Sequence, residues 1–193
     1  RIADAWVNID QKLQAKIYPD QSKNILKGGF FKRYQEEDGT GRLELAEWLR
    51  NLFEEYPNHE IFWYDPYMED VGITLLNIFA DNASNYTIIT TSSVTQADRI
   101  KNLKQACDSW EQQYGNPNLQ VLGVSPDDLH DRMILIRNKN KTITVGYHLS
   151  NSIQNANKNF PLLITPIPMK ILKQVDKYIN STISNSRDII WET

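Results

Sequence analysis

The sequence contains a single cysteine, Cys107, among its 193 residues. One cysteine excludes a disulfide bond within the chain and fits a reducing compartment, so we expect a cytoplasmic protein. No stretch approaches the roughly 20 apolar residues that a helix needs to cross a bilayer, which predicts a soluble chain that does not contact a membrane. The chain is long enough to bury a substantial core, and its composition, 40% hydrophobic and 23% charged, is that of a globular protein.

Several signatures of ligand and cofactor sites are also absent. There is no Gly-x-x-x-x-Gly-Lys phosphate loop, no dinucleotide-binding glycine fingerprint and no serine nucleophile elbow. Three histidines and one cysteine make a zinc site improbable, so we expect neither a metal nor a cofactor. The formal net charge of -3 gives no overall attraction to nucleic acid, and any phosphate contact must therefore come from local groups.

What the sequence does contain is a regular alternation of apolar runs and amphipathic stretches. An amphipathic helix from Arg42 to before Pro57 opens the main domain. Strands and helices then alternate, at 60–64, 71–80, 86–90, 96–114 and 119–124. A β-rich pair at 132–136 and 142–145 flanks a polar turn and predicts a hairpin, and a short helical segment (151–157), a strand (162–164) and a helix (170–179) follow.

This pattern predicts an α/β fold with a mixed, largely parallel sheet flanked by helices. The main domain is expected to span residues 42–193. Apolar residues at helical spacing between 3 and 17 predict that residues 1–41 form a helical appendage packed on it. Because the first residue is Arg1 rather than Met, we expect a processed or partial chain.

The candidate chemistry gathers at the open end of the predicted hairpin. His130 precedes its first strand and Arg132 begins it, while Gly146, His148 and Ser150 lie along the end of its second strand, followed by Asn151. Because antiparallel strands joined by a short turn bring their open ends together, these residues are expected to lie close to one another. An imidazole can attack phosphorus or donate a proton, while a guanidinium grips phosphate oxygens, so the pair predicts a phosphate site.

The block "LHDRMILIRNKNKTITVGYHLSNSIQNANKN" resembles the phospholipase D-like phosphodiesterases, in which a strand carries His-x-Lys and the following strand ends in a glycine, a serine and an asparagine. "YDPY" after the first strand and "TTSS" after the second also resemble the half-domain of that family, so the likeness covers roughly residues 61–179. It implies transfer at phosphorus without a metal, through a phosphohistidine.

Carried over by position, His130 would be the nucleophile or the acid, Arg132 would take the place of the family's lysine, and Ser150 or Asn151 would bind phosphate oxygens. The downstream acid position holds Arg137 or Asn138, which departs from the family pattern. The family's active site uses two motifs and this chain has one. The resemblance therefore implies a homodimer, or a second motif elsewhere in the protein or its complex.

Further candidates are weaker, and each has a simpler explanation. Asp65 and Tyr67 follow a strand at the end where α/β sheets bind ligands, but Asp-Pro is also a good turn. Ser92 could present its hydroxyl to a substrate or cap the next helix, and His148 could face the site or merely pack. Asp131 is expected to serve a turn or an ion pair. Two basic clusters could contact a nucleic-acid backbone or simply be solvated: Arg99, Lys101 and Lys104, and Arg137, Lys139 and Lys141.

The sequence thus predicts a metal-independent phosphodiesterase. Nucleic acid is the expected substrate, because no amphipathic membrane-binding stretch is present. By analogy, such a nuclease would be the effector domain of a bacterial defence protein. The alternative is a non-catalytic module of the same fold that binds phosphate, nucleic acid or a partner protein.

Overall fold

The structure is a computed structural model that describes residues 27–32, 41–80, 83–115, 118–157, 161–185 and 188–193. The strands are β1 (Gly29–Phe31), β2 (Glu60–Tyr64), β3 (Asn85–Thr91), β4 (Leu119–Val124), β5 (Met133–Arg137), β6 (Ile143–Leu149), β7 (Leu162–Pro166) and β8 (Asp188–Glu192). The helices are α2 (Arg42–Glu55), α3 (Asp70–Phe79), α4 (Ala97–Tyr114) and α5 (Met169–Ser184), with the short 3-10 segments η1 (Val94–Gln96) and η2 (Ile153–Asn157).

These strands form one mixed sheet in the order β1-β7-β6-β5-β2-β3-β4-β8, which confirms the α/β class with flanking helices. Only β2, β3 and β4 run parallel to one another, and the other five neighbouring pairs are antiparallel. The prediction of a largely parallel sheet was therefore wrong. Parallel neighbours need a crossover helix, which only α3 and α4 supply, whereas β5 and β6 are joined by a tight turn.

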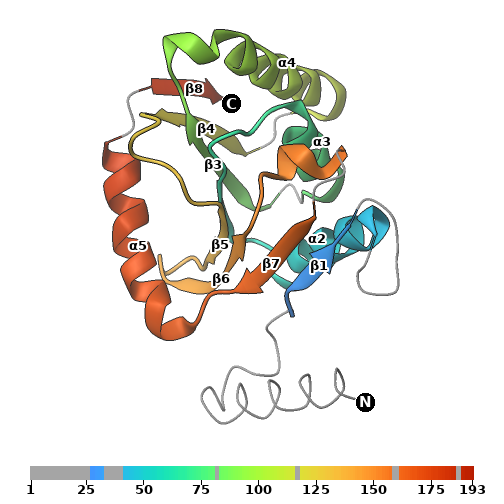
Figure 1. Cartoon of the computed structure of the whole chain (residues 1–193), viewed down its shortest axis with the longest axis vertical. Coiled ribbons are helices and arrows are strands. Elements are labelled where there is room, and N and C mark those ends of the chain that lie inside the picture. The colour runs from blue at the N-terminus through green and yellow to red at the C-terminus, as the bar shows by residue number, and fades with distance from the viewer. Residues whose placement is uncertain (1–26, 33–40, 81–82, 116–117, 158–160, 186–187) are drawn as a thin grey trace.

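Helices cover the two faces of the sheet, and each face has its own core (Figure 1). On one face α2, α3, α4 and η2 pack against the sheet, and the Trp48 ring of α2 meets the Tyr147 ring of β6 edge-on at 4.9 Å. On the other face α5 buries Leu172 and Ile179 against the sheet. Each fully buried side chain of this size contributes about 1.5–3 kcal/mol, so both layers stabilise the sheet.

The predicted hairpin is present, and local chemistry explains its turn. The Asn138 side-chain oxygen accepts hydrogen bonds from the backbone N–H groups of Asn140 (3.0 Å) and Thr142 (3.1 Å). Lys141 completes the turn with a φ of 62°. Asparagine favours such turns because its side chain can bind the backbone two residues ahead.

The described part of the predicted appendage is an edge strand rather than a helix. β1 pairs antiparallel with β7, so residues 29–31 belong to the sheet of the main domain. The segment is also fastened to α2, because Trp48 Nε1 donates to the Lys27 carbonyl at 2.7 Å and Arg42 donates to the Phe31 carbonyl at 3.1 Å. The predicted helix between residues 3 and 17 lies outside the described residues.

The C-terminal strand β8 was not predicted. It pairs with β4 and closes the other edge of the sheet. Trp191 Nε1 donates to the Asp108 carboxylate of α4 at 2.9 Å, which ties this edge to the helical layer. Within the described ranges, no helix combines the length and apolar character that crossing a bilayer requires.

Candidate functional site

The topology brings the ends of five strands together at one end of the sheet, across its strands and not along an outer strand. β2, β3 and β4 end there, β5 begins there because it runs antiparallel to β2, and β6 ends there because it runs antiparallel to β5. The loop 125–132 connects β4 to β5 and so crosses the ends of β3 and β2. Open α/β sheets bind their ligands at this end, beyond the carboxyl ends of the parallel strands.

Asp65 directly follows β2 at this end of the sheet, and it is fully buried. Its carboxylate accepts hydrogen bonds from the Ser152 hydroxyl (2.7 Å), the Ile153 N–H (2.9 Å) and the Tyr67 N–H (3.0 Å). Burial raises the pKa of Asp65, and the three hydrogen bonds and the charge of Arg132 oppose that rise. The carboxylate therefore joins the end of β2 to the segment after β6.

Ser152 is a site residue that the sequence interpretation missed. It is buried, donates to Asp65 and accepts from the Gln154 N–H at 3.2 Å. Gln154 in turn donates to the Asp70 carboxylate at 2.9 Å, so η2 is tied to the start of α3. Ser152 lies two residues beyond Ser150 in "HLSNS", and this repeat of serine was the available signal.

Arg132 lies beside Asp65 in a half-buried position. Its guanidinium carbon lies 5.3 Å from the centroid of the Tyr67 ring, within the range of a cation-π interaction. Its Nε is buried and has no hydrogen-bond acceptor among the described residues. The structure therefore brings together three of the predicted site residues, Asp65, Tyr67 and Arg132.

Two arginines of the predicted basic clusters point inward instead of toward solvent. Arg99 donates to the Met68 carbonyl (2.8 Å) and the Thr90 hydroxyl (3.0 Å), and it also contacts the Thr91 carbonyl. Burial lowers the pKa of Arg99, and the charges of Glu69, Asp65 and Tyr67 oppose this. Arg99 is therefore a clamp between the β2–α3 loop, the end of β3 and the start of α4.

Arg137 lies at the opposite end of the sheet and is 7% exposed. It pairs with Asp176 at 2.8 Å, donates to Asn180 at 3.1 Å and covers the Phe62 ring at 4.6 Å. It fastens α5 to the sheet, so neither it nor Arg99 can serve as part of a solvent-facing basic cluster. Lys101, Lys104, Lys139 and Lys141 of these clusters are exposed.

The three histidines are separated in space. His130 is exposed, and its ring makes no hydrogen bond with another described residue. His148 is paired with Met133 in the β5–β6 register, so it shares a face with Met133, which packs in the α5 layer. Since neighbouring residues of a strand point to opposite faces, His148 lies on the other face of the sheet from Tyr147 and Leu149. His59 lies at the start of β2, at the far end of the sheet.

Ser150, Asn151 and Ser92 have partners within the fold. The Ser150 hydroxyl oxygen accepts from the Leu163 N–H at 2.9 Å, and the Asn151 side-chain oxygen accepts from the Ser152 N–H at 2.9 Å. Ser92 donates to the Asp188 carboxylate at 3.3 Å, away from Asp65. These oxygens stabilise the turn after β6 and the contact with β8.

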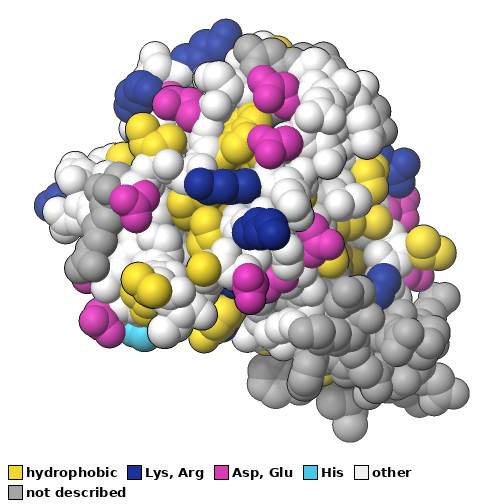
Figure 2. Space-filling model, turned by 90° about the horizontal axis from the view of Figure 1, so that it is seen from above, with side chains coloured by type: hydrophobic (Ala, Val, Ile, Leu, Met, Phe, Trp, Pro, Cys, Tyr) yellow, Lys and Arg dark blue, Asp and Glu magenta, His cyan; other side chains and the backbone are white. Residues whose placement is uncertain are grey.

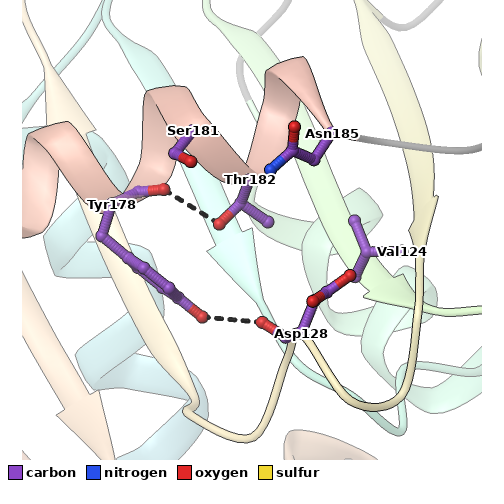
Figure 3. Close-up of a pocket in the computed structure, with 6 residues that line it drawn as sticks. All are labelled: Val124, Asp128, Tyr178, Ser181, Thr182 and Asn185. Atoms are coloured by element: carbon purple, nitrogen blue, oxygen red, sulfur yellow. Dashed lines mark hydrogen bonds between the residues drawn. The ribbon is translucent and has the colours of Figure 1, made fainter.

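A separate hollow of about 150 Å³ lies on the α5 side, beside the loop 125–132 (Figure 3). It is lined by Val124, Asp128, Tyr178, Ser181, Thr182 and Asn185. Tyr178 donates to the Asp128 carbonyl at 2.9 Å, which closes one side of the hollow. Its volume is below the roughly 300 Å³ typical of small-molecule pockets, and it includes no predicted site residue.

The surface carries charges of both signs. Figure 2 shows basic and acidic side chains interspersed with hydrophobic ones over the face seen from above. This agrees with the net charge of -3 and indicates that an anionic ligand must be recognised by local groups. Across the described parts of the chain, no three histidine, cysteine, aspartate or glutamate residues are grouped to hold a metal ion.

Comparison with known proteins gives a limited result. No model of a known protein family matches the chain, and no curated protein sequence matches it. Among solved structures, it is similar to TrmBL2, described as an archaeal chromatin protein with a novel mode of DNA binding, at a TM-score of 0.49 and 10% identity. The match covers 97% of this chain and 64% of that one. A likeness this weak carries no argument about function.

Proposed function

We propose that this chain binds the phosphate group of a phosphate ester through Arg132, in a domain of phospholipase D-like fold. One observation carries the proposal. The Arg132 guanidinium is half-buried and held against Tyr67, yet it makes no hydrogen bond to another described residue. The terminal guanidinium nitrogens of Arg99 and Arg137, by contrast, donate to acceptors of the protein itself.

An arginine whose guanidinium has no protein acceptor is suited to bind an oxyanion. Its planar guanidinium offers five N–H donors, and it matches phosphate oxygens with two parallel hydrogen bonds. Contact with the Tyr67 ring restricts the side chain before the ligand arrives, which reduces the conformational entropy lost on binding. The Asp65 carboxyl group lies near Arg132 without taking its donors, because it accepts hydrogen bonds from Ser152, Ile153 and Tyr67.

Calorimetric titration with phenyl phosphate tests this proposal. A charge-assisted hydrogen bond contributes about 1.5–3 kcal/mol, so Arg132→Gln should weaken binding by about tenfold to a hundredfold. Lys101→Gln is the matched control, since it removes one positive charge from an exposed position on α4 and should leave the affinity unchanged. Equal affinity of the wild type and Arg132→Gln would contradict the proposal.

A second candidate function is phosphodiester hydrolysis, and the position of His130 favours it. His130 is exposed, unpartnered among the described residues and two positions before Arg132. In such a reaction its imidazole nitrogen attacks phosphorus, a P–N bond forms and the P–O bond to the leaving group breaks. A second acid protonates the leaving oxygen, and water then cleaves the P–N bond.

The second acid must come from outside this site. His148 faces the α5 layer and His59 lies at the far end of the sheet, so a second copy of the chain or another part of its complex would have to supply that group.

Hydrolysis of bis(p-nitrophenyl) phosphate in the presence of EDTA tests this candidate. Activity that rises with the square of protein concentration and disappears in His130→Ala would support it. Activity that is lost with EDTA, or kept in His130→Ala, would contradict it. Cleavage of DNA under the same conditions would extend the proposal to a nuclease, the activity expected of a defence effector.

A further inference from the structure

We infer that the ligand is a nucleoside phosphate, and that Tyr67 is the surface on which its base stacks. The inference rests on the proposed binding of phosphate at Arg132. It adds a second contact, made by an aromatic ring, to the contact made by the guanidinium. The shared chemistry is a phosphate joined through ribose to a base, whether free or at the end of a single strand.

The first observation is that the backbone around Tyr67 is held by hydrogen bonds while its side chain is exposed. Residues 61–66 and Met68 are all buried, whereas Tyr67 is 52% exposed. Its N–H donates to the Asp65 carboxylate at 3.0 Å, and the preceding Pro66 carbonyl accepts from the Thr91 hydroxyl at 2.7 Å. Arg99 fixes the following residue by donating to the Met68 carbonyl.

A structural role does not account for the exposed part of the Tyr67 side chain. A structural ring contributes to stability by burial, and this ring leaves about half of its surface in water. An exposed aromatic ring on a fixed backbone instead offers a large contact area to a ligand, and a tyrosine side chain has few torsions to order on binding. Bases stack on such rings, because every base has a flat π face.

The second observation is that Tyr67 and Arg132 are in contact. The guanidinium carbon lies over the ring, 5.3 Å from its centroid, so the exposed remainder of the ring lies directly beside the guanidinium. A ligand that fills both needs a phosphate and a flat aromatic group a few bonds apart. A nucleoside phosphate has both, whereas inorganic phosphate, a sugar phosphate or a lipid headgroup would leave the ring unused.

Three probes separate the two halves of the surface: adenosine 5′-monophosphate, ribose 5-phosphate and adenosine. Stacking of one base changes affinity by about fivefold to a hundredfold, so the monophosphate should bind more tightly than ribose 5-phosphate by that factor. Tyr67→Leu should remove this difference while ribose 5-phosphate binding persists, and Tyr67→Phe should retain it. Thermal unfolding of each variant verifies that the exposed substitution leaves the fold intact.

Equal affinity for adenosine 5′-monophosphate and ribose 5-phosphate would overturn this inference and leave the proposed phosphate site standing. The inference would also be overturned if Tyr67→Leu bound the monophosphate as tightly as the wild type. Failure of all three probes to bind would instead refute the phosphate site itself. A ten-residue oligothymidylate then shows which molecule carries the nucleoside phosphate. Tighter binding than the mononucleotide indicates a single strand, and equal binding indicates a free nucleotide. Both results support a nucleoside phosphate as the ligand.

Discussion

Replacing Asp65 by alanine tests the structural basis of the site. The buried carboxylate accepts hydrogen bonds from the Ser152 hydroxyl, the Ile153 N–H and the Tyr67 N–H at 2.7–3.0 Å. Each buried donor left without an acceptor costs about 1–3 kcal/mol, and relief of the buried charge offsets part of this. We therefore expect Asp65→Ala to lower the free energy of unfolding by about 3–5 kcal/mol.

Urea unfolding at constant pH measures this loss. Asp127→Ala is the control, because its carboxylate is exposed at the same end of the sheet and should change stability by less than about 0.5 kcal/mol. Asp65→Asn keeps one acceptor oxygen and should cost less than alanine. A loss below about 1 kcal/mol for Asp65→Ala would refute the view that these three hydrogen bonds hold the end of β2 to the segment after β6.

The same residue predicts a pH dependence. Burial raises the pKa of Asp65 in the folded protein, so the folded state binds its proton more tightly than the unfolded chain does. The stability that this group contributes is therefore fully present below the unfolded pKa of about 3.9 and is lost as pH rises through the folded pKa. The stability difference between wild type and Asp65→Asn should shrink over that interval, and a difference that grew with pH would contradict the assignment.

Three further predictions concern other parts of the fold. Arg99→Met should lower the free energy of unfolding by about 2–4 kcal/mol in urea, because two carbonyls and a threonine hydroxyl lose their donor, whereas Lys101→Met on the same helix should have little effect. Gly115→Ala should cost about 1–3 kcal/mol in the same assay, because Gly115 has a φ of 85° at the end of α4, and no measurable loss would contradict this. His148→Ala should change the affinity for phenyl phosphate by less than about twofold, since His148 faces the α5 layer, and a tenfold loss would place it at the site.

The elements of the core could be predicted because their signals are local. Helices α2, α3 and α4, the strands between them and the β5–β6 hairpin all carry periodic apolar patterns or turn residues within a few positions. β1 and β8 could not be predicted in this way, because each is a short edge strand whose pairing partner lies far away in the sequence. The parallel pairs β2–β3 and β3–β4 and the antiparallel pair β5–β6 were predicted, but the other four pairs were not, because a local pattern does not show which strands lie next to each other.

The site could be predicted only in part, for a similar reason. Asp65 and Tyr67 were predicted because they follow a strand, and Arg132 was predicted because it begins the hairpin. Their roles depend on contacts across long separations, such as the bond between Ser152 and Asp65 over 87 positions. The inward orientation of Arg99 and Arg137 likewise follows from tertiary packing, and the sequence shows only that both are charged.

The most direct test of a phosphate site is the ¹H–¹⁵N signal of the Arg132 Nε–H group during titration with phenyl phosphate. The Nε–H belongs to the guanidinium that is proposed to bind, so a phosphate held by this group should shift its resonance in a saturable manner. The Nε–H signals of Arg99 and Arg137 should remain in place, because the terminal guanidinium nitrogens of both residues already donate to protein acceptors. A titration that leaves the Arg132 signal unmoved, or that moves all three signals alike, would contradict binding at Arg132.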